Sequence, residues 1–188
     1  SQMPEVIKTG KVGSFSHVVT AEEANMLQRY AQDSRLGIPL LIGIDAIHGN
    51  ALVRGATVYP APMSMASTWN LDLVRRANEE TAIEMRATGS HWSFTPNIDI
   101  ARDPRWGRVG ETFGEDSYLV GEMGVATIDG LQQGDFTGPT KVIANAKHWV
   151  AGGDPINGIN LSPMDISIRT LREDFFPPFK RAIDAGCL

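Results

Sequence analysis

The stretch LLIGID, residues Leu40 to Asp45, is a short apolar run that ends in a single carboxylate. An apolar run of this length is typical of a strand covered on both faces, as in a parallel sheet. Three other segments have the same character, at Val12–Val18, His91–Ile98 and Val142–Val150. We therefore predict that these four segments are the strands of one parallel sheet.

Segments with helical patterns separate the predicted strands. Thr20 and Glu23 have the spacing of a capping box ahead of an amphipathic stretch, and Asn70 is a predicted helix N-cap. Together the predicted helices cover residues 20–35, 70–89, 114–131 and 167–186. Strands alternating with helices predict an α/β fold with right-handed crossovers.

Two parallel-sheet architectures fit this order, an open doubly wound sheet and a closed barrel. An open nucleotide-binding sheet usually carries a glycine-rich phosphate loop after its first strand, and no such loop follows Val18. Polar residues instead follow successive predicted strands, namely Asp45, then Asn97 and Asp99, then Lys147 with His148. In a (β/α)8 TIM barrel these strand ends converge on one mouth, where the chemistry takes place. We therefore predict the barrel.

Composition excludes several classes of protein. The 188 residues carry a formal net charge of −5 and no run of basic residues, which makes nucleic acid an unsuitable partner. No apolar run approaches the roughly 20 residues of a membrane span, so no membrane association is predicted.

The single cysteine, Cys187, cannot form an internal disulfide, and we expect it to be a small buried residue. Asp99, Asp103 and His48 lack a ligand spacing, so neither a metal nor another cofactor is predicted.

The candidate site residues also have structural interpretations. Asp45 alone could cap a turn, although the polar loop that follows it favours a functional role. A lone histidine such as His148 is often a hydrogen-bonded core residue. Its neighbour Lys147 is costly to bury without a partner and therefore predicts a polar cavity.

The segment RDPRWGR, Arg102 to Arg108, is crowded with guanidinium groups. Arg102 and Arg105 are interpreted as clamps on neighbouring carboxylates, such as Asp103 or Glu111. Trp106 and Trp149 suit either ordinary packing or the apolar face of a sugar ring. Residue chemistry alone thus predicts a polyol or carbohydrate pocket at a barrel mouth.

Four motifs in order resemble the N-terminal barrel domain of glycoside hydrolase family 3, especially its periplasmic β-glucosidase branch. They are GIDAIHG at 43–49, NIDIARDPRWGRVGETFGED at 97–116, KHW at 147–149 and LREDFFPPFKRAIDAG at 171–186. The resemblance spans nearly the whole chain. It implies a β-glucoside or gluco-oligosaccharide substrate that is hydrolysed with retention of anomeric configuration.

The resemblance also implies roles for single residues. Asp45, Arg108, Lys147 and His148 match the residues that hold the terminal non-reducing glucosyl unit at the innermost subsite. Retention needs two carboxyl groups about 5 Å apart. The family's nucleophilic aspartate and acid/base glutamate have no match before Leu188, so we expect no catalytic residue within this chain.

Length leads to a related expectation. A (β/α)8 barrel takes at least about 200 residues, and this chain supplies about four strand-helix units. Residues 1–188 are therefore expected to be a single partial domain, the N-terminal half of a TIM-like barrel. Its expected partners are the remaining part of the barrel and a following domain, and its unpaired sheet edges make a homodimer possible. The family branch implies a periplasmic or secreted location.

Alternative functions remain open. One is a β-xylosidase of the same family, because the sequence does not rank the residues that contact the hydroxymethyl side of the sugar. Another is a non-catalytic half barrel that only binds sugar, which would keep the same four residues. The N-acetylglucosaminidase branch carries a KHFPGHG loop, whereas residues 147–160 read KHWVAGGDPINGIN. That difference disfavours a hexosaminidase.

Overall fold

The computed structural model describes residues 3–134 and 138–187, and it contains one parallel sheet of four strands. The strands are β1 (Ser14–Ser16), β2 (Leu41–Ile44), β3 (Trp92–Ser93) and β4 (Ile143–Ala144). They are adjacent in sequence order, β1-β2-β3-β4, and every neighbouring pair is parallel. Phe15 pairs with Ile42, Gly43 with Trp92, and Ser93 with Ala144.

This strand order distinguishes the two predicted architectures. A doubly wound sheet reverses its order at a switch point, whereas a barrel wall adds each strand beside the previous one. Successive right-handed crossovers in one direction place all the helices on one side of the sheet. The observed order is therefore that of a barrel wall, as the sequence predicted.

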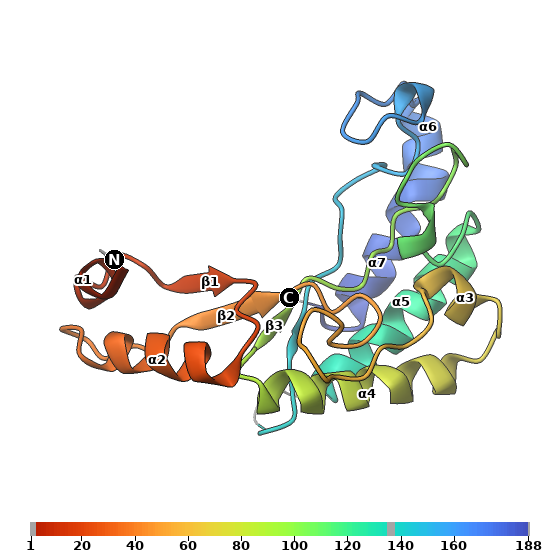
Figure 1. Cartoon of the computed structure of the whole chain (residues 1–188). Helices are drawn as coiled ribbons and strands as arrows, with labels where there is room; N and C mark the ends of the chain where they lie inside the picture. Colours follow the sequence, from red (N-terminus) through yellow and green to blue (C-terminus); the bar gives the residue numbers. More distant parts are fainter. Residues whose placement is uncertain (1–2, 135–137, 188) are drawn as a thin grey trace.

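The long helices follow the strands. They are α2 (Ala21–Gln32), α4 (Leu71–Ala87), α5 (Ser117–Gln132) and α7 (Phe176–Asp184). Helix α4 packs on α5, and α5 packs on α7. Figure 1 shows an L-shaped molecule, with α1, α2 and β1 in one arm and α6 and α7 in the other. Helices α4 and α5 lie near the corner.

The helix starts predicted at Thr20 and Asn70 are confirmed, whereas the helix predicted over residues 114–131 begins at Ser117. The Thr20 hydroxyl accepts a hydrogen bond from the Glu23 amide at 3.2 Å, and the Asn70 side chain accepts one from the Leu73 amide at 3.0 Å. Each bond satisfies an amide that has no partner within its own helix. At the other end of α4, Gly89 has φ +93°, a left-handed conformation that favours glycine and ends the helix.

Several short elements complete the chain. They are α1 (Met3–Lys8), α3 (Pro62–Ala66), the 3₁₀ helices η1 (Val109–Glu111) and η2 (Ile156–Gly158), α6 (Ile168–Thr170) and the π-helix η3 (Leu171–Phe175). The predicted helix over residues 167–186 thus consists of α6, η3 and α7 in succession. None of the helices in the described part of the chain is both long and apolar enough to cross a membrane.

The two faces of the sheet differ. Ile42 and Ile44 are fully buried in two apolar clusters that include the helix residues Leu27 and Val74. On the other face, a Cβ at Gly43 would lie 2.5 Å from the ring of Phe94. Only glycine therefore fits beneath that ring.

The strands are shorter than predicted. For β3 the cause is local, because Thr95 is followed by Pro96, which has no amide hydrogen for the ladder. Pairing resumes only as an isolated bridge between Asn97 and Lys147. Among the described residues β1 and β4 form the two edges of the sheet.

Candidate functional site

Each of the four strands is followed by a polar residue beyond its carboxyl end. His17 follows β1, Asp45 follows β2, Asp99 follows β3, and Lys147 follows β4. The carboxyl ends of parallel strands lie on one edge of the sheet, so these side chains are brought together there.

Asp45 is the centre of the first group of contacts. Its Oδ1 atom pairs with the Lys147 ammonium, and its Oδ2 atom lies 2.8 Å from His17 Nε2. Burial opposes the charge of this carboxyl, but the hydrogen bonds with Lys147 and His17 outweigh it and lower the pKa of Asp45. Asp45 is therefore the partner that compensates the charge of the partly buried Lys147.

Arg108 is the centre of the second group. Its Nε and Nη2 atoms donate to the Glu111 carboxylate, at 3.1 Å and 2.8 Å, and its Nη1 atom lies 3.2 Å from His148 Nε2. Hydrogen bonding to Glu111 raises the pKa of Arg108. Burial disfavours the charge of Glu111, yet the bonds from Arg108 outweigh it and lower the pKa of Glu111. Arg108 therefore remains positive while its Nη1 edge faces His148.

His148 connects this group to a fully buried carboxylate. Its Nδ1 atom lies 2.7 Å from Asp99 Oδ2, and the same oxygen accepts the backbone amide of His148 at 3.2 Å. The Asp99 side chain is 0% exposed. Since Arg108 can only donate, Nε2 of His148 accepts from it, and the ring hydrogen resides on Nδ1 and is donated to Asp99. Asp99 thus selects the tautomer of His148.

The two groups are close enough to interact electrostatically. Asp45 contributes to the raised pKa of Arg108, and Lys147 contributes to the lowered pKa of Glu111. The structure therefore brings the four predicted residues Asp45, Arg108, Lys147 and His148 into one cluster. The peptide bond Lys147–His148 within the cluster is cis, and so is Trp149–Val150 just after it.

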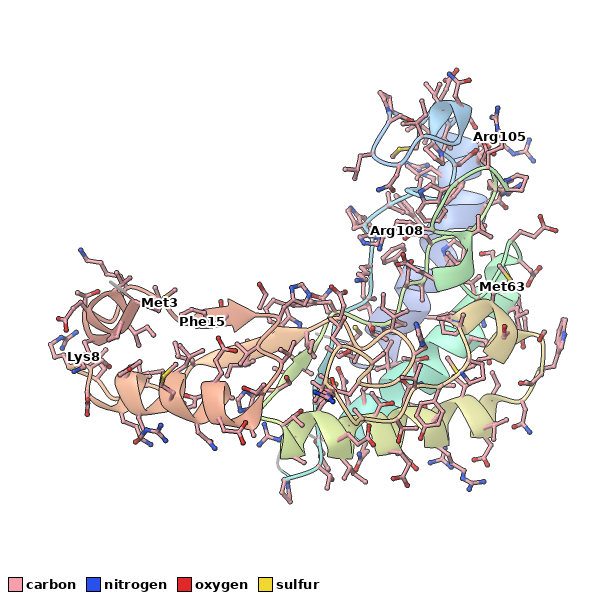
Figure 2. The ribbon with its side chains drawn as sticks, viewed as in Figure 1. Met3, Lys8, Phe15, Met63, Arg105 and Arg108 are labelled. Atoms are coloured by element: carbon pink, nitrogen blue, oxygen red, sulfur yellow. The ribbon has the colours of Figure 1, made fainter. Side chains whose placement is uncertain are left out.

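The other arginines of the RDPRWGR segment are engaged elsewhere. Arg105 pairs with Asp103 at 2.7 Å, as predicted, and Figure 2 shows Arg105 at the outer edge of the molecule, away from Arg108. Arg102 pairs with Asp174, which lies 72 positions later in the chain. Glu111, which had been predicted as a partner for Arg102 or Arg105, is bound by Arg108 instead.

The two tryptophans predicted near the site differ in exposure. Trp106 is 2% exposed and donates its indole hydrogen to Asn160 at 2.9 Å, whereas Trp149 is 68% exposed and stacks on Phe176.

His48 lies 3.0 Å from the Tyr59 carbonyl oxygen through Nδ1. Cys187 packs against the larger core cluster and is only partly buried.

The predicted site omits two residues of the cluster. His17 was hidden because the first strand was predicted to extend to Val18, whereas β1 ends at Ser16. Asp99 was recognised as a strand-end residue but was given no role. The rule that polar residues after strands form the site would have found both.

The cluster combines carboxylate oxygens with guanidinium, ammonium and imidazole groups at fixed positions. Carboxylates accept hydrogen bonds from hydroxyl groups, and cationic side chains donate to hydroxyl oxygens. Such a surface suits a polyol with adjacent hydroxyls. Among residues 3–134 and 138–187, no group of three or more His, Cys, Asp or Glu side chains has the arrangement of a metal site.

Comparisons with known proteins show the family to which the chain is related. A family model described as the N-terminal domain of glycosyl hydrolase family 3 matches residues 1–188. A periplasmic β-glucosidase of Salmonella typhimurium is 36% identical over 97% of this chain, and a β-xylosidase of Formosa agariphila is 42% identical over 94%. The chain spans about a quarter of the length of these relatives, 23% and 26% respectively.

Solved structures show the same fold. A β-glucosidase involved in saponin metabolism from intestinal bacteria superposes with a TM-score of 0.93 at 39% identity, over 100% of this chain and 25% of its own. A β-glucosidase from Listeria innocua in complex with glucose superposes with a TM-score of 0.87 at 36% identity, over 93% and 24%. These neighbours are barrel-type domains, so the α/β barrel prediction is confirmed.

Proposed function

The chain belongs to glycoside hydrolase family 3, and from that premise we propose that it supplies the sugar-binding part of a retaining β-glucosidase. Asp45, Arg108, Lys147 and His148 bind the terminal non-reducing β-D-glucosyl residue. Residues 1–188 form a single partial domain, the first half of the (β/α)8 barrel.

One observation carries this proposal. The Asp45–Lys147 pair and the Arg108–His148 pair lie together at one edge of the sheet. A glucosyl unit presents adjacent hydroxyl groups, each of which needs one acceptor and one donor. Asp45 supplies the acceptor, while Lys147 and Arg108 supply donors held in place by carboxylates. Because these side chains are already oriented, little conformational entropy is lost when a sugar binds.

The reaction itself is assigned to groups outside residues 1–188. Retention requires a nucleophilic carboxylate and an acid/base carboxyl about 5 Å apart. Asp45 is unsuited to act as the general acid, because the hydrogen bonds with Lys147 and His17 lower its pKa and keep it ionised. Each of its oxygens keeps a second lone pair that can accept from a sugar hydroxyl. We assign the nucleophile and the acid/base to the remaining barrel and a following domain.

The second candidate is a β-xylosidase of the same family. The observation that favours it is the 42% identity to a relative named β-xylosidase, against 36% for the periplasmic β-glucosidase. A xylosyl unit lacks only the hydroxymethyl group of glucose, so it presents the same adjacent hydroxyls to Asp45 and Arg108.

The two candidates are separated by kinetics with matched substrates. The protein expressed from the complete reading frame that encodes this chain would be assayed with 4-nitrophenyl β-D-glucoside and 4-nitrophenyl β-D-xyloside. We expect kcat/KM to be at least about tenfold higher for the glucoside, which is a difference of about 1.4 kcal/mol. A reversed ratio would establish the xylosidase, and glucose binding without any hydrolysis would establish a non-catalytic sugar-binding module.

Location and assembly belong to the same proposal. Relatives from Salmonella typhimurium and Dickeya chrysanthemi are named periplasmic enzymes, which supports an exported, periplasmic or secreted protein. The edge strands β1 and β4 offer backbone groups for pairing with another chain or segment, including a homodimer partner. Fractionation of the source cells and the sedimentation mass of the purified protein test these two points.

A further inference from the structure

A cavity of about 430 Å³ extends outward from the cluster. Arg108 and His148 line its inner end, so it is continuous with the proposed sugar site. Its other lining includes six apolar side chains, namely Trp106, Trp149, Val150, Leu161, Pro163 and Met164. This volume lies in the range of small-molecule binding pockets, about 300 to 1,000 Å³.

The outer wall is a loop held by hydrogen bonds. The Ile156 amide donates to the Pro163 carbonyl at 3.0 Å, and the Ser162 hydroxyl donates to the Ile156 carbonyl at 2.9 Å. Asn160 accepts the indole hydrogen of Trp106 at 2.9 Å. These bonds fix the loop against the buried tryptophan.

The fixed loop presents apolar surface to solvent. Leu161 is 92% exposed and has φ +69°, a conformation that leucine rarely adopts. Met164 and Trp149, which line the same cavity, are 40% and 68% exposed. Exposed apolar residues gathered in one cavity, unlike scattered ones, mark a binding surface.

The polar groups of the outer cavity decide which ligand it suits. A second sugar ring would need hydrogen-bonding partners for several hydroxyl groups. The Asn160 carbonyl oxygen and the Ser162 hydroxyl hydrogen are already used within the loop. Apolar side chains make up most of the remaining lining, so an apolar group fits the outer cavity better than a sugar.

We propose that this cavity binds an apolar leaving group, so that the preferred substrates are alkyl or polycyclic β-glycosides. The inference rests on the proposed function, because it places the sugar at Arg108 and His148. Leu161 and Met164 contact the apolar group and determine specificity for it. The cavity has a charged inner end and an apolar outer end, and such a glycoside likewise has a polar sugar and an apolar leaving group.

The test is a comparison of two non-hydrolysable ligands, methyl and octyl β-D-thioglucoside, which differ only in alkyl length. Their Kd values would be measured by calorimetry on the complete protein, below the micelle concentration of the octyl compound. We expect octyl thioglucoside to bind at least about tenfold more tightly than the methyl compound, because apolar area leaves water. Leu161→Ser is expected to reduce that ratio about three- to fivefold.

Ile159→Ser is the matched control, since Ile159 is 62% exposed in the same loop but does not line the cavity. It should leave the octyl-to-methyl ratio unchanged. Equal affinities for the two ligands in the wild-type protein, as expected if other polypeptide fills the cavity, would overturn the inference, and so would a ratio that Leu161→Ser leaves intact. Failure of glucose itself to bind would instead contradict the proposed function.

Discussion

The ammonium of Lys147 pairs with the carboxylate of Asp45, although 102 positions separate the two residues in the chain. Lys147 is only 15% exposed, and burying its charge would be unfavourable without this partner. The pair joins β2 to β4 across β3, which places one acceptor and one donor at a fixed separation beside the sugar site. Residues of the proposed site therefore hold one another in position before any ligand arrives.

Asp45→Asn should weaken sugar binding strongly. The substitution keeps the shape of the side chain but removes its charge, and hydrogen bonds to charged groups contribute about 1.5 to 3 kcal/mol. We expect the Kd for glucose to rise about 10- to 100-fold by calorimetry. The control is Asp33→Asn, a surface partner of Lys8 at 3.6 Å, which should leave the Kd unchanged. Equal glucose affinity in wild type and Asp45→Asn would remove Asp45 from the site.

His17→Asn tests whether His17 positions Asp45. His17 has φ +58°, a conformation that asparagine tolerates, so the backbone should be preserved while the shorter side chain loses its contact with Asp45. Loss of one hydrogen bond, worth about 1 kcal/mol, should raise KM about three- to tenfold with little change in kcat. A fall in kcat at constant KM would contradict a positioning role. The free energy of unfolding should change by less than about 0.5 kcal/mol.

Asp99→Asn should alter the tautomer of His148. The buried Asp99 carboxylate can only accept, whereas an asparagine amide can also donate to Nδ1. We expect ¹⁵N NMR to find the His148 ring hydrogen on Nδ1 in the wild type and increasingly on Nε2 in the variant. A hydrogen on Nε2 would face an N–H group of Arg108, so Arg108 would lose its acceptor on His148. Glucose affinity should therefore fall as well. Asp103→Asn, on the outer side of the same segment, should leave the tautomer unchanged.

Glu111→Gln should lower stability in a pH-dependent way. The pKa of Glu111 is lower in the folded chain than its ordinary value of 4.5, so its contribution is fully present above that value. The contribution disappears as the pH falls through the folded pKa. We expect the variant to lose about 1 kcal/mol of unfolding free energy at pH 7 and progressively less below about pH 4.5 in urea titrations.

The matched control for this prediction is Glu173→Gln. Glu173 forms an exposed pair with Arg169 at 3.0 Å, and such pairs contribute little. Its effect should stay below about 0.5 kcal/mol at every pH. If Glu111→Gln behaves in the same way, the Arg108–Glu111 pair does not stabilise the loop.

Much of the fold was readable from local signals. Thr20 and Asn70 cap their helices as predicted, because the N-cap bond joins residues only three apart. Strand lengths were less predictable, because a strand ends where its backbone leaves the extended conformation. The first strand stops at Ser16 because His17 has φ +58°, although the His17 amide still donates to the Gly43 carbonyl at 2.8 Å, and the error hid His17 from the predicted site.

The partners of charged residues were predicted only when they were close in sequence. Arg105 binds Asp103, two positions away, as expected, whereas Arg102 binds the distant Asp174. Glu111 was expected to bind a different arginine, because spacing alone does not distinguish Arg105 from Arg108. The loop conformation assigns Glu111 to Arg108.

The sequence by itself determined the alternation of strands and helices and the helix ends, because these depend on residues that are neighbours in the chain. Its resemblance to the family supplied the candidates Asp45, Arg108, Lys147 and His148. Only the tertiary structure decided which side chains meet. Parallel pairing brings the ends of β1, β2, β3 and β4 to one edge, so the contacts of Asp45 with His17 and of Asp99 with His148 come from different strands. Sheet geometry, which acts over long sequence separations, determines those contacts.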